Sequence, residues 1–217
     1  MSNSAPAGAN RRAIIGTRLG IIGGTFDPVH IGHLILAEEA RAALSLDRVV
    51  FLPAAQPWRK AGSPVSPAAE RLAMVRLAIA DNPQFEVSTA EIERSGPTYT
   101  ADTLEHLHER VPEADLWFIL GSDALLDLPN WKDPHRILAQ ARLAVACRAP
   151  LAPERLAEVE RLVPGVRSHT DFVPMPQVSV SSSELRQRLR AGVSTRYWLP
   201  APVERYAVER GLYVRGE

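Results

Sequence analysis

The sequence predicts an α/β fold, a doubly wound and mainly parallel sheet with helices on both faces. Short apolar runs typical of buried strands alternate along the chain with longer segments whose apolar residues recur at helical spacing. Such alternation is typical of parallel sheets, because each connection between parallel strands has to cross one face of the sheet. With 217 residues, the chain has a length that suits one domain of this class, or one domain with a small appendage.

The expected strands cover residues 19–22, 48–52, 85–88, 116–120, 143–147 and a short run around 172–173. The expected helices cover residues 31–44, 67–80, 101–110, 152–162, 183–191 and 202–210. We expect a Rossmann-like sheet in which the loops after the first, second and fourth strands meet in one crevice. In open α/β sheets, that carboxyl edge is where ligands bind.

Residues 1–17 are expected to form a flexible N-terminal extension, followed by a single domain over 18–217 with a C-terminal helical portion. The extension is polar and rich in small residues, and the apolar run that follows Arg12 has only three residues, 13–15. A signal-peptide core needs at least about seven. Two long loops, 54–67 and 128–133, carry tryptophan, basic residues and proline.

Composition excludes several classes of partner. Lys+Arg and Asp+Glu both number 25, so no overall field attracts nucleic acid. No apolar run approaches the ~20 residues of a membrane span. The single cysteine, Cys147, cannot form an internal disulfide and is expected to be a buried strand residue, which indicates a reducing, cytoplasmic setting. The oligomeric state stays open, a homo-oligomer included.

Residues 23–34, with the sequence GGTFDPVHIGHL, are the most informative segment. Paired glycines let the backbone approach a ligand closely, and a helix beginning offers unpaired N–H groups to an anion. His30 and His33 are three residues apart, so they share one helical face. The segment predicts a site for a reacting phosphate. A glycine pair is also often a simple tight turn, and two histidines can be ordinary helix residues or half of a metal site.

A second helix beginning with the same features follows at residues 181–186. Ser181 and Glu184 fit a capping box, which needs no ligand, but three successive hydroxyls exceed what one cap uses. Arg186 lies in the first helical turn, where a cation opposes the helix dipole at a cost of about 0.3–1 kcal/mol. A bound anion would reverse that sign, so the segment predicts a second phosphate site.

Three further features have both a binding and a purely structural interpretation. The segment 98–100 (Thr-Tyr-Thr) opens a helix, where it can accept a carboxylate or only cap the helix. Trp131 can stack on a ring or pack its loop against the domain. Asp123 follows a strand through Gly121, and it can bind ribose hydroxyls or cap a helix.

The segment 23–34 resembles the nucleotidyltransferase signature GxFDPxHxGH, whose H-x-G-H element binds the reacting phosphates. Residues 180–186 resemble the partner element ISSTxxR. Val180 replaces its isoleucine and Ser183 its threonine, so a β-branched residue and a hydroxyl are kept. Segments 96–104, 121–123, 128–131 and 197–213 resemble bacterial nicotinate-nucleotide adenylyltransferases. This resemblance extends from about residue 19 to residue 214.

The resemblance implies that ATP and nicotinate mononucleotide give deamido-NAD and pyrophosphate. We expect direct in-line attack, with Mg²⁺ arriving on ATP, because no carboxylate cluster in the sequence indicates a metal site built by the protein. It implies an ATP site at Gly23, Gly24, Thr25, Phe26, His30, His33, Gly121, Asp123, Ser181, Ser182, Ser183 and Arg186. Of these, His30, His33 and Arg186 would be catalytic, and the acceptor site would hold Lys60, Thr98, Tyr99 and Trp131. Arg59 stands where the family often has histidine.

Three other functions stay open at this point. The same chemistry can act on nicotinamide mononucleotide or phosphopantetheine, although the segment 98–99 and Trp131 favour a ring that bears a carboxylate. A non-catalytic regulatory protein can bind ATP without turnover. A metal-dependent hydrolase can use His30, His33 and Asp27.

Overall fold

A six-stranded parallel sheet forms the centre of the computed structural model, which describes residues 17–55, 65–94, 96, 98–147 and 151–213. The strands are β1 (Arg18–Gly24), β2 (Arg48–Pro53), β3 (Phe85–Val87), β4 (Asp115–Gly121), β5 (Arg142–Cys147) and β6 (Thr170–Pro174). Each expected strand is present. The predicted parallel sheet is therefore confirmed, while residues 1–16 of the expected extension lie outside the described residues.

The strand order is β3-β2-β1-β4-β5-β6, the order of Rossmann-like sheets. The order reverses between β1 and β4, which are hydrogen-bonded neighbours. The loops that follow these two strands consequently diverge at the carboxyl edge and leave a crevice between them. The topology therefore places the glycine–histidine segment, which follows β1, at the position where such sheets bind ligands.

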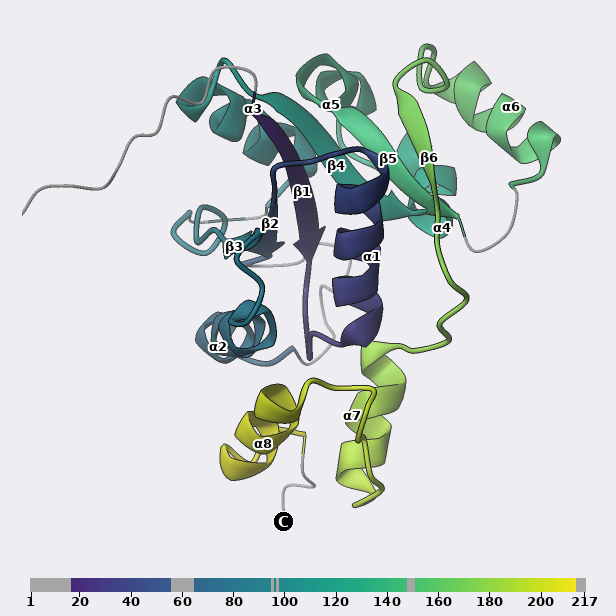
Figure 1. Ribbon diagram of the computed structural model, residues 1–217. Coiled ribbons are helices and arrows are strands. Elements are labelled where there is room, and N and C mark those ends of the chain that lie inside the picture. Colours follow the sequence, from purple (N-terminus) through teal and green to yellow (C-terminus); the bar gives the residue numbers. More distant parts are fainter. Residues whose placement is uncertain (1–16, 56–64, 95, 97, 148–150, 214–217) are drawn as a thin grey trace, which may run out of the picture.

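Helices cover both faces of the sheet (Figure 1). They are α1 (Ile31–Ala43), α2 (Ala68–Ile79), α3 (Thr100–Arg110), α4 (Ser122–Leu126), the 3₁₀ turn η2 (Leu128–Asn130), α5 (Pro134–Gln140), α6 (Pro153–Leu162), α7 (Ser182–Arg190) and α8 (Ala201–Glu209). Successive strand residues point to opposite faces, so Ile22 joins the buried cluster with α1 and α2, and Ile21 the one with α3 and α5. Within the described residues, no helix has the length and apolar character needed to cross a membrane.

All six helices expected from the sequence are present, each with ends within one residue of the prediction. The short helices α4 and α5 and the turn η2 were not predicted, and η2 lies inside the expected loop 128–133. Helices of 5 and 7 residues contain at most two turns. Their apolar residues therefore show no period that distinguishes a helix from a loop.

The C-terminal helices α7 and α8 lie beyond the carboxyl edge of the sheet, and α7 begins next to the beginning of α1 (Figure 1). Leu185 on α7 and Val203 on α8 are buried in the same cluster as α1 and α2. On the outer side, Glu70 of α2 accepts hydrogen bonds from Tyr206 at 2.8 Å and Arg210 at 2.7 Å. This helical portion is therefore continuous with the core of the domain.

Cys147 ends β5 as expected, but it is half-buried rather than buried. Burial raises the pKa of its thiol above the ordinary value. The thiol therefore stays protonated at neutral pH, the form that is a poor nucleophile.

A polar cluster ties the amino ends of three adjacent strands together. Asp171 of β6 accepts two hydrogen bonds from the Arg142 guanidinium, at 2.7 and 2.9 Å, and one from the Trp117 indole at 2.9 Å. The bonds from Arg142, together with that from Trp117, hold the pKa of Asp171 below its ordinary value, against the opposing effect of burial. The ionised carboxylate is therefore the form that stabilises this end of the sheet.

We expect Asp171→Asn to lower the free energy of unfolding at neutral pH, because the paired charge is lost. A carboxyl group whose pKa falls on folding stabilises the protein above its unfolded pKa and loses that contribution as pH falls through its folded pKa. The stability difference between wild type and variant should therefore shrink below about pH 4, as measured by urea unfolding at several pH values. A difference that stays constant over that range would contradict the assignment.

Candidate nucleotide-binding site

The beginnings of α1 and α7 border one cleft of about 590 Å³, the helix-end cleft. His30, Gly32 and His33 line it from α1, and Ser181 and Ser182 line it from α7. The sequence predicted two anion-binding helix beginnings far apart along the chain, and the fold brings them to the same volume.

Glycine at position 32 allows the close approach of these two helix ends. A Cβ atom built on Gly32 would lie 2.8 Å from Cγ1 of Val180, closer than real Cβ atoms come to their neighbours. Next to this contact, the Ser182 hydroxyl donates to the Pro28 carbonyl at 3.0 Å. The serine run is therefore fixed against the loop that carries the histidines.

The two histidines form a stacked pair. Their ring centroids are 3.8 Å apart, and the His30 backbone N–H donates to Nδ1 of His33 at 3.2 Å. Because Nδ1 of His33 accepts, a neutral His33 ring carries its proton on Nε2 and can donate from there. The ring of Phe26 packs edge-on against His33 at 5.0 Å and is 2% exposed. Phe26 therefore supports the histidine pair from the core.

The backbone at the beginning of α1 is less open than the sequence predicted. The N–H of Ile31 donates to the carbonyl of Trp198 at 3.0 Å, so the expectation of an unpaired donor is wrong at this residue. The donor is satisfied by the segment that precedes α8. At this helix beginning, the side chains of His30 and His33 line the cleft and can contact a ligand.

Each hydroxyl of the serine run has a partner within the protein. Ser181 is the N-cap of α7 and accepts from the Glu184 N–H at 3.2 Å, which confirms the capping interpretation for this residue. Ser183 accepts from the Arg186 guanidinium at 3.2 Å, and Arg186 also donates to the Asp27 carbonyl at 2.7 Å. Ser182 and Arg186 thus join α7 to the β1 loop, the segment 25–30 between β1 and α1, whereas Ser181 and Ser183 bond within α7.

Part of the cleft wall is apolar, and we call this part the apolar recess: Leu126, Ala146, Leu151, Ala152 and Met175. Gly121, Ser122, Asp123 and Arg155 are also in the lining. Gly121 is the N-cap of α4, so the exposed Asp123 lies in the first turn and does not cap the helix. The apolar residues of this recess come from four separate elements and connections. No local sequence pattern could have indicated them.

A second, smaller cavity of about 230 Å³, the apolar cavity, borders the end of β1. It is lined by Ile21, Gly23, Gly24, Thr25, Leu52, Ala54, Glu91, Thr98, Thr100, Thr103, Leu104, Phe118 and Trp131. The expected ATP residues at 23–25 are therefore located in this wall and not in the helix-end cleft. Residues of the crevice predicted from the sequence therefore line two cavities.

Trp131 both lines the apolar cavity and packs its own segment. Its indole N–H donates to Asp127 at 3.1 Å, and its ring lies edge-on to Phe118 at 6.0 Å. At the start of α3, Tyr99 is the N-cap residue, and its side chain makes no capping hydrogen bond. The Lys132 ammonium lies 4.2 Å from the centre of the Tyr99 ring.

Glu91 is a buried acid in the wall of the apolar cavity that was not predicted. Its side chain is 7% exposed, and hydroxyls of Thr103, at 2.9 Å, and Thr98 hydrogen-bond to it. Burial raises its pKa above the ordinary value, against the effect of these bonds. In the sequence Glu91 lies among other charged residues of a turn, so nothing distinguished it from a solvated side chain.

The proposed metal-hydrolase site is not supported by the geometry. Asp27 is 2% exposed, and its carboxylate accepts from the Tyr213 hydroxyl at 2.6 Å and the Ser66 N–H at 3.2 Å. The parts of the chain that the structure describes contain no group of three or more His, Cys, Asp or Glu that could hold a metal ion. Lys60 and Arg59, expected near the phosphates, lie outside the described residues.

Comparisons with known proteins agree with this geometry. A family model described as cytidylyltransferase-like matches residues 21–188. A protein of Thermomicrobium roseum named "Probable nicotinate-nucleotide adenylyltransferase" is 45% identical over 197 residues, 91% of this chain and 92% of that protein. A Roseiflexus protein of the same name is 47% identical over 195 residues, 90% of this chain and 97% of that protein.

A solved structure shares the fold at lower identity. The structure described as "Plasmodium falciparum nicotinic acid mononucleotide adenylyltransferase complexed with NaAD" has a TM-score of 0.74 and 18% sequence identity, over 91% of this chain and 97% of that chain. The span matched by the family model contains the histidine pair and the serine run. The chain therefore belongs to the cytidylyltransferase-like family, among its nicotinate-nucleotide adenylyltransferases.

Proposed function

We propose that this protein transfers the adenylyl group of ATP to nicotinate mononucleotide, giving deamido-NAD and pyrophosphate in NAD biosynthesis. The observation that carries the proposal is the pair of cavities lined by residues of the segment 23–33. One is large and ends at two helix beginnings, and the other is small, mostly apolar and bordered by hydroxyls and aromatic rings. Two substrates bound in these cavities would meet at the same loop.

ATP fits the helix-end cleft by its chemistry. The apolar recess around Leu126, Ala146 and Met175 suits a flat base, whereas the phosphates would lie at the other end of the cleft. There, His30 and His33 supply ring donors, and the beginning of α7 supplies a favourable dipole for an anion.

The pyridine ring of the acceptor fits the apolar cavity. Trp131 and Phe118 provide aromatic surface, and Thr98 and Thr100 provide polar groups at the start of α3. A ring carboxylate could accept hydrogen bonds from this segment. The mononucleotide phosphate would then point towards the β1 loop, where the α-phosphate of ATP is expected.

The reaction is one in-line displacement. A phosphate oxygen of the mononucleotide forms a bond to the α-phosphorus of ATP, while the bond from that phosphorus to the β-bridging oxygen breaks and pyrophosphate leaves. The nucleophile is already an anion, so no general base is needed. Positioning can supply roughly 7–11 kcal/mol of the barrier, and donors such as His30 and His33 stabilise the charge that develops on the phosphorus oxygens.

We propose that Mg²⁺ enters with ATP, held by phosphate oxygens, and neutralises charge on the triphosphate. The described cleft residues fit this route, because Asp123 is the one acid among them and they contain no metal-binding group. Arg186 and Ser183 do not line the cleft themselves, but both follow Ser181 and Ser182 of its wall on α7. A change of the Arg186 side-chain rotamer would let it add positive charge near the pyrophosphate. Lys60 is proposed for the same task from the sequence alone.

The proposed function is tested by incubating the purified protein with ATP, Mg²⁺ and one acceptor at a time, with measurement of pyrophosphate release. We expect the highest kcat/KM with nicotinate mononucleotide and lower values with nicotinamide mononucleotide and phosphopantetheine. No product with any acceptor would contradict the proposal and favour the nucleotide-binding regulatory protein.

We expect His33→Ala to lower kcat by at least about 100-fold, the usual cost of removing one transition-state donor. The ATP dissociation constant should change modestly, because the contact strengthens only as charge develops. His106→Ala is the matched control, since the His106 side chain is 45% exposed on α3. Unchanged turnover in His33→Ala would exclude this role.

We expect Arg186→Ala to bind ATP and pyrophosphate at least about tenfold more weakly, because a charge-assisted contact is removed. Isothermal titration measures this directly. Arg190→Ala is the matched control, because Arg190 is an exposed arginine at the far end of the same helix. Equal ATP affinity in Arg186→Ala and wild type would show that the beginning of α7 does not bind the triphosphate.

A further inference from the structure

Tyr213 follows α8 and reaches the loop after β1, 186 residues earlier in the chain. Its hydroxyl donates to Oδ1 of Asp27 at 2.6 Å, and Asp27 is 2% exposed. Tyr213 lines neither of the two substrate cavities. The contact therefore needs an explanation other than substrate binding.

Asp27 is the point at which several distant segments meet. Its Oδ2 accepts from the Ser66 N–H at 3.2 Å, and its backbone carbonyl accepts from Arg186 at 2.7 Å. His30, at the edge of the helix-end cleft, is three residues further along the chain. Any displacement of Asp27 is thus passed to the first histidine over a short stretch of backbone.

The Arg71 guanidinium on α2 offsets the negative charge of the buried Asp27 carboxylate and hydrogen-bonds to the same loop. Its guanidinium is 1% exposed and donates to the carbonyls of Thr25 at 2.8 Å and Ser66 at 2.9 Å. The negative charge of Asp27 favours the charged form of this guanidinium, against the opposing effect of its burial. A buried carboxylate and a buried guanidinium are each costly without a partner. The two groups and the tyrosine therefore form one mutually dependent cluster.

The residue held between these contacts is Phe26. Its φ of 50° is in the left-handed region, which is unfavourable for a residue with a bulky side chain. Thr25 on one side is fixed by Arg71, and Asp27 on the other side is fixed by Tyr213. The Phe26 ring is the edge-on partner of His33. The cluster thus keeps in place the backbone conformation on which the histidine pair packs.

We propose that Tyr213 is a positioning residue that acts through Asp27 and Phe26 to set the geometry of the His30–His33 pair. The proposal rests on the proposed adenylyl transfer only for its kinetic readout. Burial, together with the hydrogen bond to Asp27, raises the pKa of Tyr213 well above its ordinary value. The phenol consequently keeps its proton and its donor role throughout the physiological pH range.

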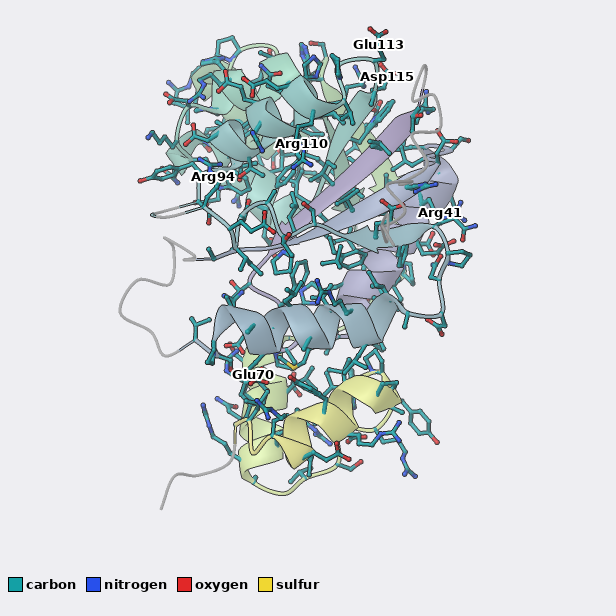
Figure 2. All side chains as sticks on the ribbon, turned by 90° about the vertical axis from the view of Figure 1, so that its left-hand side faces the viewer. Arg41, Glu70, Arg94, Arg110, Glu113 and Asp115 are labelled. Carbon is teal, nitrogen blue, oxygen red and sulfur yellow. The ribbon has the colours of Figure 1, made fainter. Side chains whose placement is uncertain are left out.

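The chain supplies a matched control one helix away. Tyr206 on α8 also donates its hydroxyl to a carboxylate, Glu70 on α2, at 2.8 Å. Glu70 lies between the ribbons of α2 and α8 (Figure 2). Tyr206→Phe and Tyr213→Phe therefore each remove one hydroxyl that links the C-terminal portion to the rest of the protein. Only the second hydroxyl bonds to the loop that carries the histidines.

In the full-length protein, we expect Tyr213→Phe to lower kcat by about 10- to 100-fold, as small displacements of reacting groups do. KM for ATP and for nicotinate mononucleotide should change much less than kcat. The imidazole NMR signals of His30 and His33, assigned with His→Gln variants, should shift in Tyr213→Phe without substrate. In Tyr206→Phe, kcat and these signals should match wild type. Thermal unfolding of both variants is measured in parallel.

Two results would overturn the proposal. One is histidine signals in Tyr213→Phe identical to those of wild type, and the other is an equal loss of kcat in both variants, which would indicate a merely structural role. Asp27→Asn provides a second variant if Tyr213→Phe folds poorly, and it should shift the same histidine signals. The NMR readout needs no turnover, so inactivity of the wild-type protein would contradict the proposed function without deciding the role of Tyr213.

Discussion

The arrangement of the site depends on the contact between Gly32 and Val180. With hydrogen alone on Cα of residue 32, the segment before α7 can lie against the beginning of α1, where a Cβ would be 2.8 Å from a methyl group of Val180. The bond from Ser182 to Pro28 is made across the same junction, between residues 154 positions apart. Without this close approach, the serine run and the histidine pair would not border one cleft.

The sheet topology explains why a single loop serves two cavities. The connections that leave β1 and β4 diverge at the carboxyl edge of the sheet, so a crevice opens next to the segment that leaves β1. Gly23 and Gly24 face the apolar cavity, whereas His30 and His33 face the helix-end cleft. The segment 23–33 therefore contributes residues to both cavities, in which the two substrates with their mutually repelling phosphates would bind. A reaction that needs no acid or base depends chiefly on such an arrangement.

Much of the fold could be predicted from the sequence, because periodicity is a local signal. The strands and the longer helices follow from apolar spacing, and the parallel sheet follows from their alternation. The histidine and serine segments were also recognisable, because each joins chemically suitable residues within a few positions. The division into two cavities was not predictable, since it depends on how the loop after β1 lies between its neighbours.

The residues that the sequence did not indicate share a physical reason. Glu91 and Arg71 are charged, and charged side chains are usually solvated, yet here they are 7% and 1% exposed. Their burial depends on partners from other elements, such as Thr103 for Glu91 and the Thr25 carbonyl for Arg71. The backbone donor of Ile31, expected to be open to an anion, is likewise satisfied by a distant carbonyl. Long-range hydrogen bonding is not encoded in any short window of residues.

The long sequence separation between Asp27 and its partners has a consequence for biosynthesis. Arg186 and Tyr213 follow Asp27 by 159 and 186 residues, so a ribosome that adds about 5–20 residues per second makes them on the order of ten seconds or more later. During that interval, Asp27 of the nascent chain lacks its hydrogen bonds with Arg186 and Tyr213. Because α7 follows all six strands along the chain, the helix-end cleft can be completed only after every strand of the sheet has been synthesised.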